Sequence, residues 1–288
     1  MPDQPSRANE GETIVIYHGD CFDGFTSAWS HKTWRPEEHA TYLPAKHGEP
    51  APDVSGKRVY IVDFAYPRDT LLRMHGQAES ILVLDHHKTA QADLEGLPFC
   101  EFDMNRSGAG ITWDYFAAEG EPRHWLVDVV EDRDLWRFRF GDQTRFTMAY
   151  VATLPMTFEA WDELASAGME DAVRQGSAIQ RYIDSYGEKA CREALFLPIG
   201  GVTVPVINVG YQNGSDHIDR LIKLHPTYPF AASFCLRGDG QWQFSLRSRG
   251  EFDVSAVARQ YGGGGHHNAS GFVAPSLPWA SDASAENS

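Results

Sequence analysis

The first half of the chain alternates short apolar runs with amphipathic segments. Three of the runs, at residues 13–17, 58–62 and 80–84, have the length and composition of buried strands. Segments with helical patterning lie between and after these runs, at residues 24–34, 67–77, 107–119 and 124–136. Apolar strands that alternate with helices are typical of a mostly parallel sheet with helices on both faces. We therefore predict an α/β domain over residues 12–150.

The pattern changes after this first domain. Residues 157–195 contain no proline, and from Met169 to Ala190 apolar residues recur at helical spacing, which predicts one long connecting helix. Strand-like runs and helical segments then follow, at residues 201–210, 215–224, 230–238, 242–248 and 253–261. We predict a smaller mixed α/β C-terminal domain over residues 196–274, joined to the first domain by a helical linker over residues 151–195.

Both ends of the chain are polar and rich in small residues, so residues 1–11 and 275–288 are expected to be disordered. No stretch approaches the roughly 18 to 20 consecutive apolar residues of a membrane span, and the first residues lack the apolar core of a signal peptide. We therefore expect a cytoplasmic protein with no membrane partner.

The formal net charge of the 288 residues is −15. A protein that follows a long polyanion presents a basic surface, so long duplex DNA is not an expected partner. A small anionic substrate is compatible with this charge, because bound dications and a few local Arg or His residues can reverse the field inside a cleft. The cysteines at 21, 100, 191 and 235 form no CxxC pair, which indicates neither a disulfide framework nor a zinc knuckle. A homodimer is left open.

Side chains that commonly bind metals follow each of the three apolar runs. They are His18, Asp20 and Asp23 after the first run, Asp63 after the second, and Asp85, His86 and His87 after the third. Open α/β sheets carry their chemistry at the carboxyl ends of the strands, so we expect these residues to converge on one edge. Each one alone could be a cap or turn residue. Together they need a cation or a reaction to offset their repulsion and desolvation.

Five motifs occur in an order that resembles a known family. They are YHGDCFDGFTSA at 17–28, VDF at 62–64, LDHH at 84–87, EDRDLW at 131–136 and GGGGHHNASGF at 262–272. The combination resembles the DHH phosphoesterase family with its DHH-associated C-terminal domain, across residues 13–274. The resemblance implies that the first domain is catalytic and binds metal and that the C-terminal domain binds substrate.

The resemblance also implies the ligands of two metal ions. Asp63 would bridge the two, Asp23 and His86 would hold one of them, and His18 would help to hold the other. Imidazole and carboxylate ligands suit Mn²⁺, with Mg²⁺ or Co²⁺ as substitutes. The expected catalytic set is completed by Asp85, which would orient an imidazole, and by His87, which would face the substrate phosphate.

Two positions in this ligand set leave alternatives open. For the last carboxylate the sequence offers Asp132 and Asp134, and we prefer Asp132, since Asp134 could instead pair with a neighbouring arginine. The family motif has a further aspartate where this chain has Cys21. Cys21 could be a thiolate ligand, the first metal could be weak or absent, or Asp20 could supply the missing carboxylate, which we slightly favour because carboxylate suits Mn²⁺ better than a thiol.

The glycine-rich segment at 262–267 predicts an anion clamp. Glycine lets backbone amides approach an anion closely, so we assign substrate binding to Gly263, Gly264, Gly265 and His266, with His267 less favoured. A flexible linker is the alternative. Arg247 would add a bidentate donor to a phosphate, although a surface arginine at a strand end is equally compatible. Ser107 is expected to cap a helix, with an anion site at that helix N-terminus as the alternative.

These observations predict a metal-dependent phosphodiesterase with two domains. The expected substrates are short oligonucleotides or dinucleotides, including an exonuclease-like attack on a chain end. The alternatives are a phosphatase acting on nucleoside bisphosphate or polyphosphate, and a noncatalytic nucleotide- or RNA-binding module. The remaining histidines, His47 among them, have no other residues of metal-binding type near them in the sequence. They are expected to be surface or packing residues.

Overall fold

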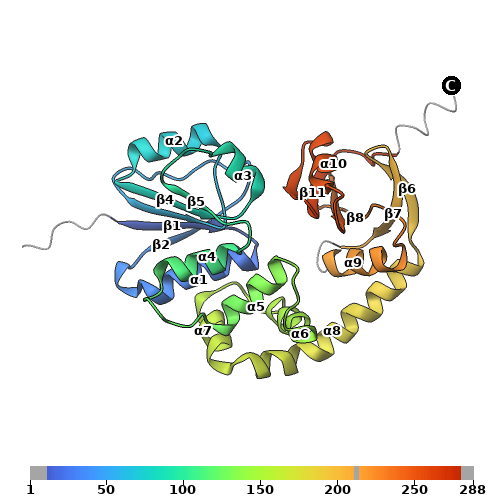
Figure 1. The fold of residues 1–288 in the computed structure, drawn as a ribbon, viewed down its shortest axis with the longest axis horizontal. Helices are drawn as coiled ribbons and strands as arrows, with labels where there is room; N and C mark the ends of the chain where they lie inside the picture. Colours follow the sequence, from blue (N-terminus) through green and yellow to red (C-terminus); the bar gives the residue numbers. More distant parts are fainter. Residues whose placement is uncertain (1–11, 211–213, 280–288) are drawn as a thin grey trace, which may run out of the picture. The chain divides into compact units, whose positions relative to one another are not determined.

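The computed structural model describes residues 12–210 and 214–279. The chain forms two compact units, one that ends at Ile179 and one that begins at Gln180 (Figure 1). The predicted fold class is confirmed: a parallel sheet with helices, a long helix, and a smaller second unit with a mixed sheet.

The first unit is built on a five-stranded parallel sheet in the order β2-β1-β3-β4-β5. Its strands are β1 (Thr13–His18), β2 (Thr41–Ala45), β3 (Arg58–Val62), β4 (Ser80–Asp85) and β5 (Cys100–Phe102). The chain steps from β1 to β2 in one direction and then returns to β3 on the other side of β1. This reversal creates a switch point between the carboxyl ends of β1 and β3, which is where open α/β sheets bind ligands.

Helices cover both faces of this sheet. In Figure 1, α2 (Arg68–Gln77) and α3 (Lys88–Asp93) lie on one face, and α1 (Phe22–Trp34) and α4 (Gly108–Phe116) lie on the other. Ile14 and Ile16 of β1 pack in the same cluster as Leu71 of α2, whereas Val15 packs with Phe116 of α4. Because both faces are buried, the central strands β1, β3 and β4 are apolar between their ends.

Four further helices follow in the chain. They are α5 (Trp125–Asp134), α6 (Asp142–Val151), α7 (Phe158–Ala167) and α8 (Met169–Arg192), and a short 3-10 helix, η1 (Pro36–Glu38), follows α1. The long helix predicted here is confirmed as α8, but it does not extend back to residue 157: Gly168, with φ of 85°, ends α7 before α8 begins. The helical spacing seen from Met169 onward belongs to α8, which contains the division between the two units.

The second unit is built on a six-stranded sheet in the order β10-β11-β9-β8-β7-β6, in which only β7 and β8 pair in parallel. Its elements are β6 (Leu195–Ile199), β7 (Val202–Asn208), α9 (Gly214–Leu224), β8 (Phe230–Leu236), β9 (Trp242–Ser248), α10 (Val254–Gln260), β10 (Gly264–His266) and β11 (Ala269–Ala274). Val254 and Val257 of α10 pack in one apolar cluster of the sheet, and Ile218 and Leu221 of α9 pack in another.

The chain after β11 corrects the expected start of the C-terminal tail. The Trp279 ring centroid lies 5.3 Å from that of Phe234 and 5.9 Å from that of Phe244, and Leu277 joins the same cluster. Two apolar side chains thus keep residues 275–279 on the sheet. The other expected tail residues lie outside the described ranges. Within those ranges, no helix is long and apolar enough to cross a membrane.

Candidate metal centre

Three adjacent strands deliver polar residues to one edge of the first sheet. His18 ends β1, Asp63 follows β3, and Asp85 ends β4 directly before His86. Because the three strands pair in parallel and in register, their ends lie at the same height. His18 and Asp63 therefore flank the switch point of the sheet.

Asp63 lies at the centre of this edge and is 1% exposed. Its backbone is in the left-handed region, with φ of 54°, which aspartate tolerates better than most residues. Its Oδ1 lies 3.1 Å from Nε2 of His86, and its Oδ2 lies 3.5 Å from Nδ1 of His18. Burial disfavours the ionised form, but the surrounding histidines outweigh burial and hold the pKa of Asp63 well below its usual range. Asp63 is thus an ionised carboxylate whose two oxygens face different histidines.

His86 is surrounded by three carboxylates. Its Nε2 lies 3.1 Å from Asp63, 3.6 Å from Oδ2 of Asp23 and 3.6 Å from Oδ2 of Asp134. Burial opposes protonation of the ring, but these carboxylates outweigh it and raise the pKa of His86 to about 10. Burial, followed by repulsion from Asp63 and Asp134, raises the pKa of Asp23 well above its usual value. The described residues therefore place more negative charge here than one imidazolium can offset.

The N-terminus of α4 holds Asp23 in place. The amide of Gly108 donates to Oδ2 at 2.6 Å, and the amide of Ala109 donates to Oδ1 at 3.1 Å. The Oγ of Ser107 accepts from the amide of Gly110, which confirms the predicted N-cap. The anion at this helix N-terminus is the protein's own carboxylate, which the sequence did not reveal.

A buried glutamate supports the same turn from α5. Glu131 is 2% exposed, and its Oε2 accepts from the amide of Ser107 at 3.2 Å and from Nε of Arg106 at 3.0 Å. Its Oε1 accepts from Arg123 at 2.9 Å. A Cβ at Gly110 would lie 2.0 Å from Oε2, so this close approach requires glycine. Glu131 thus fixes the helix that in turn positions Asp23.

Asp85 binds the backbone of His86 and the ring of His87. It is fully buried, and its Oδ1 accepts from the amide of His86 at 2.7 Å and lies 2.7 Å from Nδ1 of His87. Burial opposes protonation of His87, but Asp85 outweighs it and raises the pKa of this ring. The structure therefore places Asp85 beside the imidazole of His87, as an orienting carboxylate.

The structure corrects the preference for Asp132 over Asp134. Asp132 is fully buried, but its carboxylate accepts from the amides of Arg139 at 2.7 Å and Phe140 at 3.4 Å and from the hydroxyl of Thr144. The loop after α5 and the hydroxyl of Thr144 in α6 thus satisfy the hydrogen-bonding capacity of this carboxylate. Asp134 at the end of α5 is the carboxylate that reaches His86.

Asp20 and Cys21 are also placed differently from the preferred expectation. Asp20 has φ of 56°, and its largely exposed carboxylate pairs with Nζ of Lys46 at 2.5 Å, so it does not join the cluster. Cys21 does: one ligand atom each from His18, Cys21 and Asp63 lies within 4.8 Å of the others. Burial and the neighbouring carboxylates raise the pKa of the Cys21 thiol well above its usual value.

His47 is a neighbour of the site that sequence reasoning missed. Its ring centroid lies 5.8 Å from that of His18 and 4.9 Å from that of Phe64. It follows β2, a short edge strand that contains a proline and that the apolar pattern did not predict. Recognising β2 as the neighbour of β1 would have placed His47 at the same edge.

The polar atoms of this edge fit divalent cations. Three sets can each bring their ligand atoms within 4.8 Å of one another: Asp63 with Asp85, His86 and His87; His18 with Cys21 and Asp63; and Asp23 with His86 and Asp134. Among the described residues, the buried Nδ1 of His18 and Oδ2 of Asp63 have no hydrogen-bond partner. Buried polar atoms are normally satisfied, so this pair fits the ligand atoms of a divalent cation.

Most of the predicted substrate residues of the second unit lie in its sheet, and Gly263 directly precedes β10. His266 pairs with Ala269, and Ala269 pairs with Arg247, so His266 and Arg247 project from the same face two strands apart. Nη2 of Arg247 donates to Oγ of Ser215 at 2.6 Å.

The glycines next to His266 form ordered backbone rather than a flexible linker. A Cβ at Gly263 would lie 2.1 Å from the carbonyl of Gly271, and a Cβ at Gly265 would lie 2.6 Å from the carbonyl of Ala269. Gly265 also has φ of 136°. Gly264 and Gly265 belong to β10.

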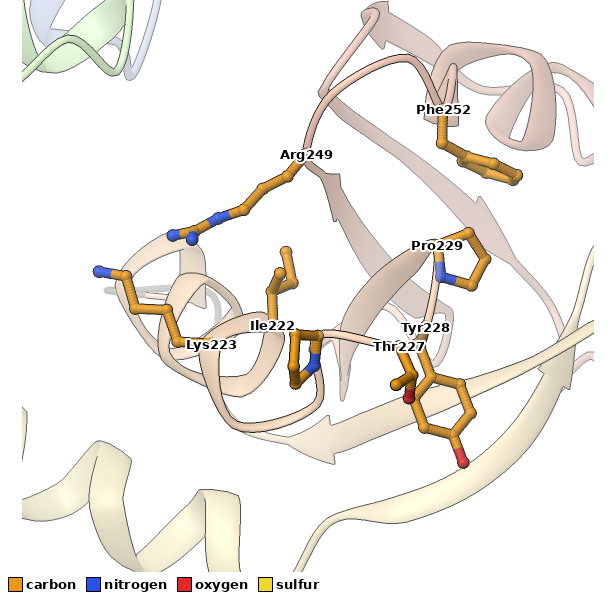
Figure 2. A pocket seen from close by; sticks show the side chains of 8 residues that line it. Ile222, Lys223, Thr227, Tyr228, Pro229, Arg249 and Phe252 are labelled. Atoms are coloured by element: carbon orange, nitrogen blue, oxygen red, sulfur yellow. The ribbon is translucent and has the colours of Figure 1, made fainter.

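The second unit also contains a separate hollow of about 500 Å³ (Figure 2). Its lining includes Lys223, Arg249, Tyr228 and Phe252. Both cations pair with the buried Asp219, at 2.8 Å for Lys223 and 2.5 Å for Arg249. No predicted metal or substrate residue lines this hollow.

Comparison with known proteins agrees with these observations. The profile of the DHHA1 domain matches residues 218–286. Uncharacterized protein R106 of Acanthamoeba polyphaga mimivirus is 31% identical to this chain, and the match covers 90% of this chain and 67% of that protein. The chain belongs to the DHH family of phosphoesterases and carries a DHHA1 domain in its C-terminal part.

Three solved structures share the fold. An exopolyphosphatase-related protein from Bacteroides fragilis has a TM-score of 0.56 at 12% identity and covers 96% of this chain and 90% of its own. The pGpG-specific phosphodiesterase PggH from Vibrio cholerae has a TM-score of 0.54 at 14% identity, with 96% of both chains covered. RecJ from Thermus thermophilus in complex with Mn²⁺ has a TM-score of 0.53 at 15% identity and covers 92% of this chain and 50% of its own.

Proposed function

We propose that this chain is a metal-dependent phosphodiesterase that acts on short oligonucleotides or dinucleotides. The observation that carries the proposal is the position of Asp63. Its Oδ1 lies next to Nε2 of His86, and its Oδ2 lies next to Nδ1 of His18. One ionised carboxylate therefore contacts two groups of ligand atoms. A carboxylate in this position suits the bridge between two dications.

Dications held at Asp63 would stabilise charge on the phosphoryl oxygens and activate a water molecule near neutral pH. We assign one position to Asp23, His86 and Asp134 and the other to His18 with Asp63. Asp85 fixes the ring of His87, and we assign this imidazole to donate a proton or a hydrogen bond to a phosphoryl oxygen. The carboxylate and imidazole ligands favour Mn²⁺ or Mg²⁺ at the first position.

Short substrates are favoured by charge and by the second unit. A net charge of −15 disfavours a long polyanion, because such a ligand needs many basic contacts. Arg247 and His266 share a face of the second sheet, where we assign them to one terminal phosphate or nucleotide. Among proteins with this fold, PggH is a pGpG-specific phosphodiesterase, which supports a dinucleotide as the first substrate to test.

Hydrolysis of bis-p-nitrophenyl phosphate with added Mn²⁺ tests the chemistry. We expect release of p-nitrophenol by the wild type, loss of release in Asp63→Asn, and unchanged release in Asp69→Asn, an exposed aspartate of α2 that serves as the matched control. Retained turnover in Asp63→Asn would refute the metal mechanism. Binding of nucleotides without turnover of any ester would instead identify a noncatalytic binding module.

A substrate panel then tests the specificity. The panel contains dinucleotides, short RNA and DNA oligonucleotides, cyclic dinucleotides, nucleoside bisphosphates and polyphosphate. We expect the highest kcat/KM for dinucleotides or short oligonucleotides and a raised KM for them in Arg247→Ala. Faster release of phosphate from bisphosphates or polyphosphate would make the chain a phosphatase.

A further inference from the structure

Cys21 precedes α1 at a position where helices prefer a side-chain oxygen as acceptor. It is the N-cap residue of α1, with φ of −124° and ψ of 130°, and its side chain makes no capping hydrogen bond. Aspartate, asparagine or serine would serve a helix better at this position. The half-buried thiol instead lies with His18 and Asp63, whose ligand atoms fall within 4.8 Å of its own.

A second observation points into the same space. Asp63 is 1% exposed, and its Oδ2 is a buried acceptor with no hydrogen-bond partner among the described residues. Nδ1 of His18 lies 3.5 Å from Oδ2, which is long for a hydrogen bond. An unsatisfied buried carboxylate oxygen, an imidazole nitrogen and a thiol sulfur therefore converge without satisfying one another.

We propose that His18, Cys21 and Asp63 form a thiolate-containing site that takes a borderline dication such as Zn²⁺ or Co²⁺ in preference to Mn²⁺ or Mg²⁺. This inference rests on the proposed function, because it concerns one of its two metal positions. Sulfur, nitrogen and oxygen ligands together suit Zn²⁺, and three protein ligands leave a position open, as in catalytic zinc sites. Binding of the cation displaces the thiol proton to solvent.

The other group of ligands has a different chemistry. Asp23, His86 and Asp134 offer two carboxylates and an imidazole and no sulfur, which suits a harder ion. Asp20 does not add a carboxylate to the site of His18, Cys21 and Asp63, because it pairs with Lys46. The two metal positions beside Asp63 therefore differ in the softness of their ligands, and we expect them to bind two different metals.

Cobalt spectroscopy of the metal-free protein tests this inference. A Co²⁺–thiolate bond gives a near-ultraviolet charge-transfer band, which carboxylate and imidazole ligands do not give. We expect the band in the wild type and in Cys100→Ser, which removes another partly buried cysteine of the first unit. We expect its loss in Cys21→Ser and in Cys21→Asp, with Co²⁺ still bound by Cys21→Asp because the carboxylate is also a ligand.

Thiol protection gives an independent readout. Zn²⁺ should lower alkylation of the peptide that contains Cys21, at concentrations where Mn²⁺ does not, and should leave alkylation of Cys100 unchanged. Tight Co²⁺ binding with no charge-transfer band, or a band that persists in Cys21→Asp, would overturn the thiolate site while leaving the phosphodiesterase proposal intact. Failure to bind any dication would instead overturn the proposed function itself.

Discussion

Replacing Gly108 by alanine tests how closely α4 must approach the metal centre. Gly108 is the first residue of α4 and is buried. An added Cβ would lie 2.4 Å from Cβ of Asp63 and 2.8 Å from both its Cα and its Oδ1. Carbon atoms in contact prefer separations of about 3.5–4.0 Å, so the helix or Asp63 would have to move by about 1 Å. The backbone of Gly108 is not in the left-handed region, so the effect would be purely steric.

The expected cost follows from this overlap. Overpacking in a buried region typically costs about 1–3 kcal/mol, against a gain of at most about 1 kcal/mol for alanine over glycine in a helix. Movement of α4 would also pull the amide of Gly108 away from Asp23, where it now donates at 2.6 Å. We therefore expect Gly108→Ala to lower both the stability of the metal-free protein and its affinity for Mn²⁺.

Thermal unfolding and calorimetric titration with Mn²⁺ measure the two effects. Each kcal/mol of lost unfolding free energy lowers Tm by about 2–4 °C in a domain of about 150–250 residues. Gly76→Ala in α2 is the matched control, because Gly76 is exposed and a Cβ there meets no heavy atom within 4 Å. Its Tm should be equal to or above that of the wild type. If Gly108→Ala melted and bound Mn²⁺ like Gly76→Ala, the close approach of α4 to Asp63 would be wrong.

Three further predictions concern the charged residues around the centre. Asp134→Asn should weaken Mn²⁺ binding without lowering Tm. Asp132→Asn should lower Tm, because hydrogen bonds to a charged group contribute about 1.5–3 kcal/mol each to stability. The opposite pattern would identify Asp132 as the ligand. Glu131→Gln should lower Tm by removing a buried charge held by two arginines, and an unchanged Tm would refute this support. The stability that metal-free protein gains from protonated His86 should be complete below pH 6.5 and be lost as pH rises to about 10, whereas His86→Gln should remove this loss from the Tm profile.

The sheet edge could be predicted from sequence because its signals are local. Each of the apolar runs before His18, Asp63 and Asp85 is short, and each is followed at once by a polar residue. Parallel pairing then forces these ends together, whatever the rest of the chain does. The capping role of Ser107 was equally local, since it depends on the hydroxyl and the amide three residues later.

The rest of the site depends on contacts that the sequence does not contain. Asp132 and Asp134 are equivalent as acids in the motif, and only the amides of the loop after α5 decide that Asp132 is already satisfied. Asp20 is excluded by a left-handed backbone and by Lys46, which lies on the segment after the unpredicted strand β2. The pairing of Asp23 with α4 joins residues far apart in the chain, so helical patterning alone could not reveal it.

Charge balance explains why the metal-free and metal-bound protein should differ in protonation. Asp23, Asp63 and Asp134 surround one imidazole, and the structure compensates by holding a proton on His86 and by favouring a proton on Asp23. A dication at the same position would supply two positive charges and compete with both protons. Binding should therefore release protons and tighten as pH rises, which calorimetry in buffers of different ionisation enthalpy measures. Binding of Mn²⁺ without proton release would mean that the cation occupies a different part of the molecule.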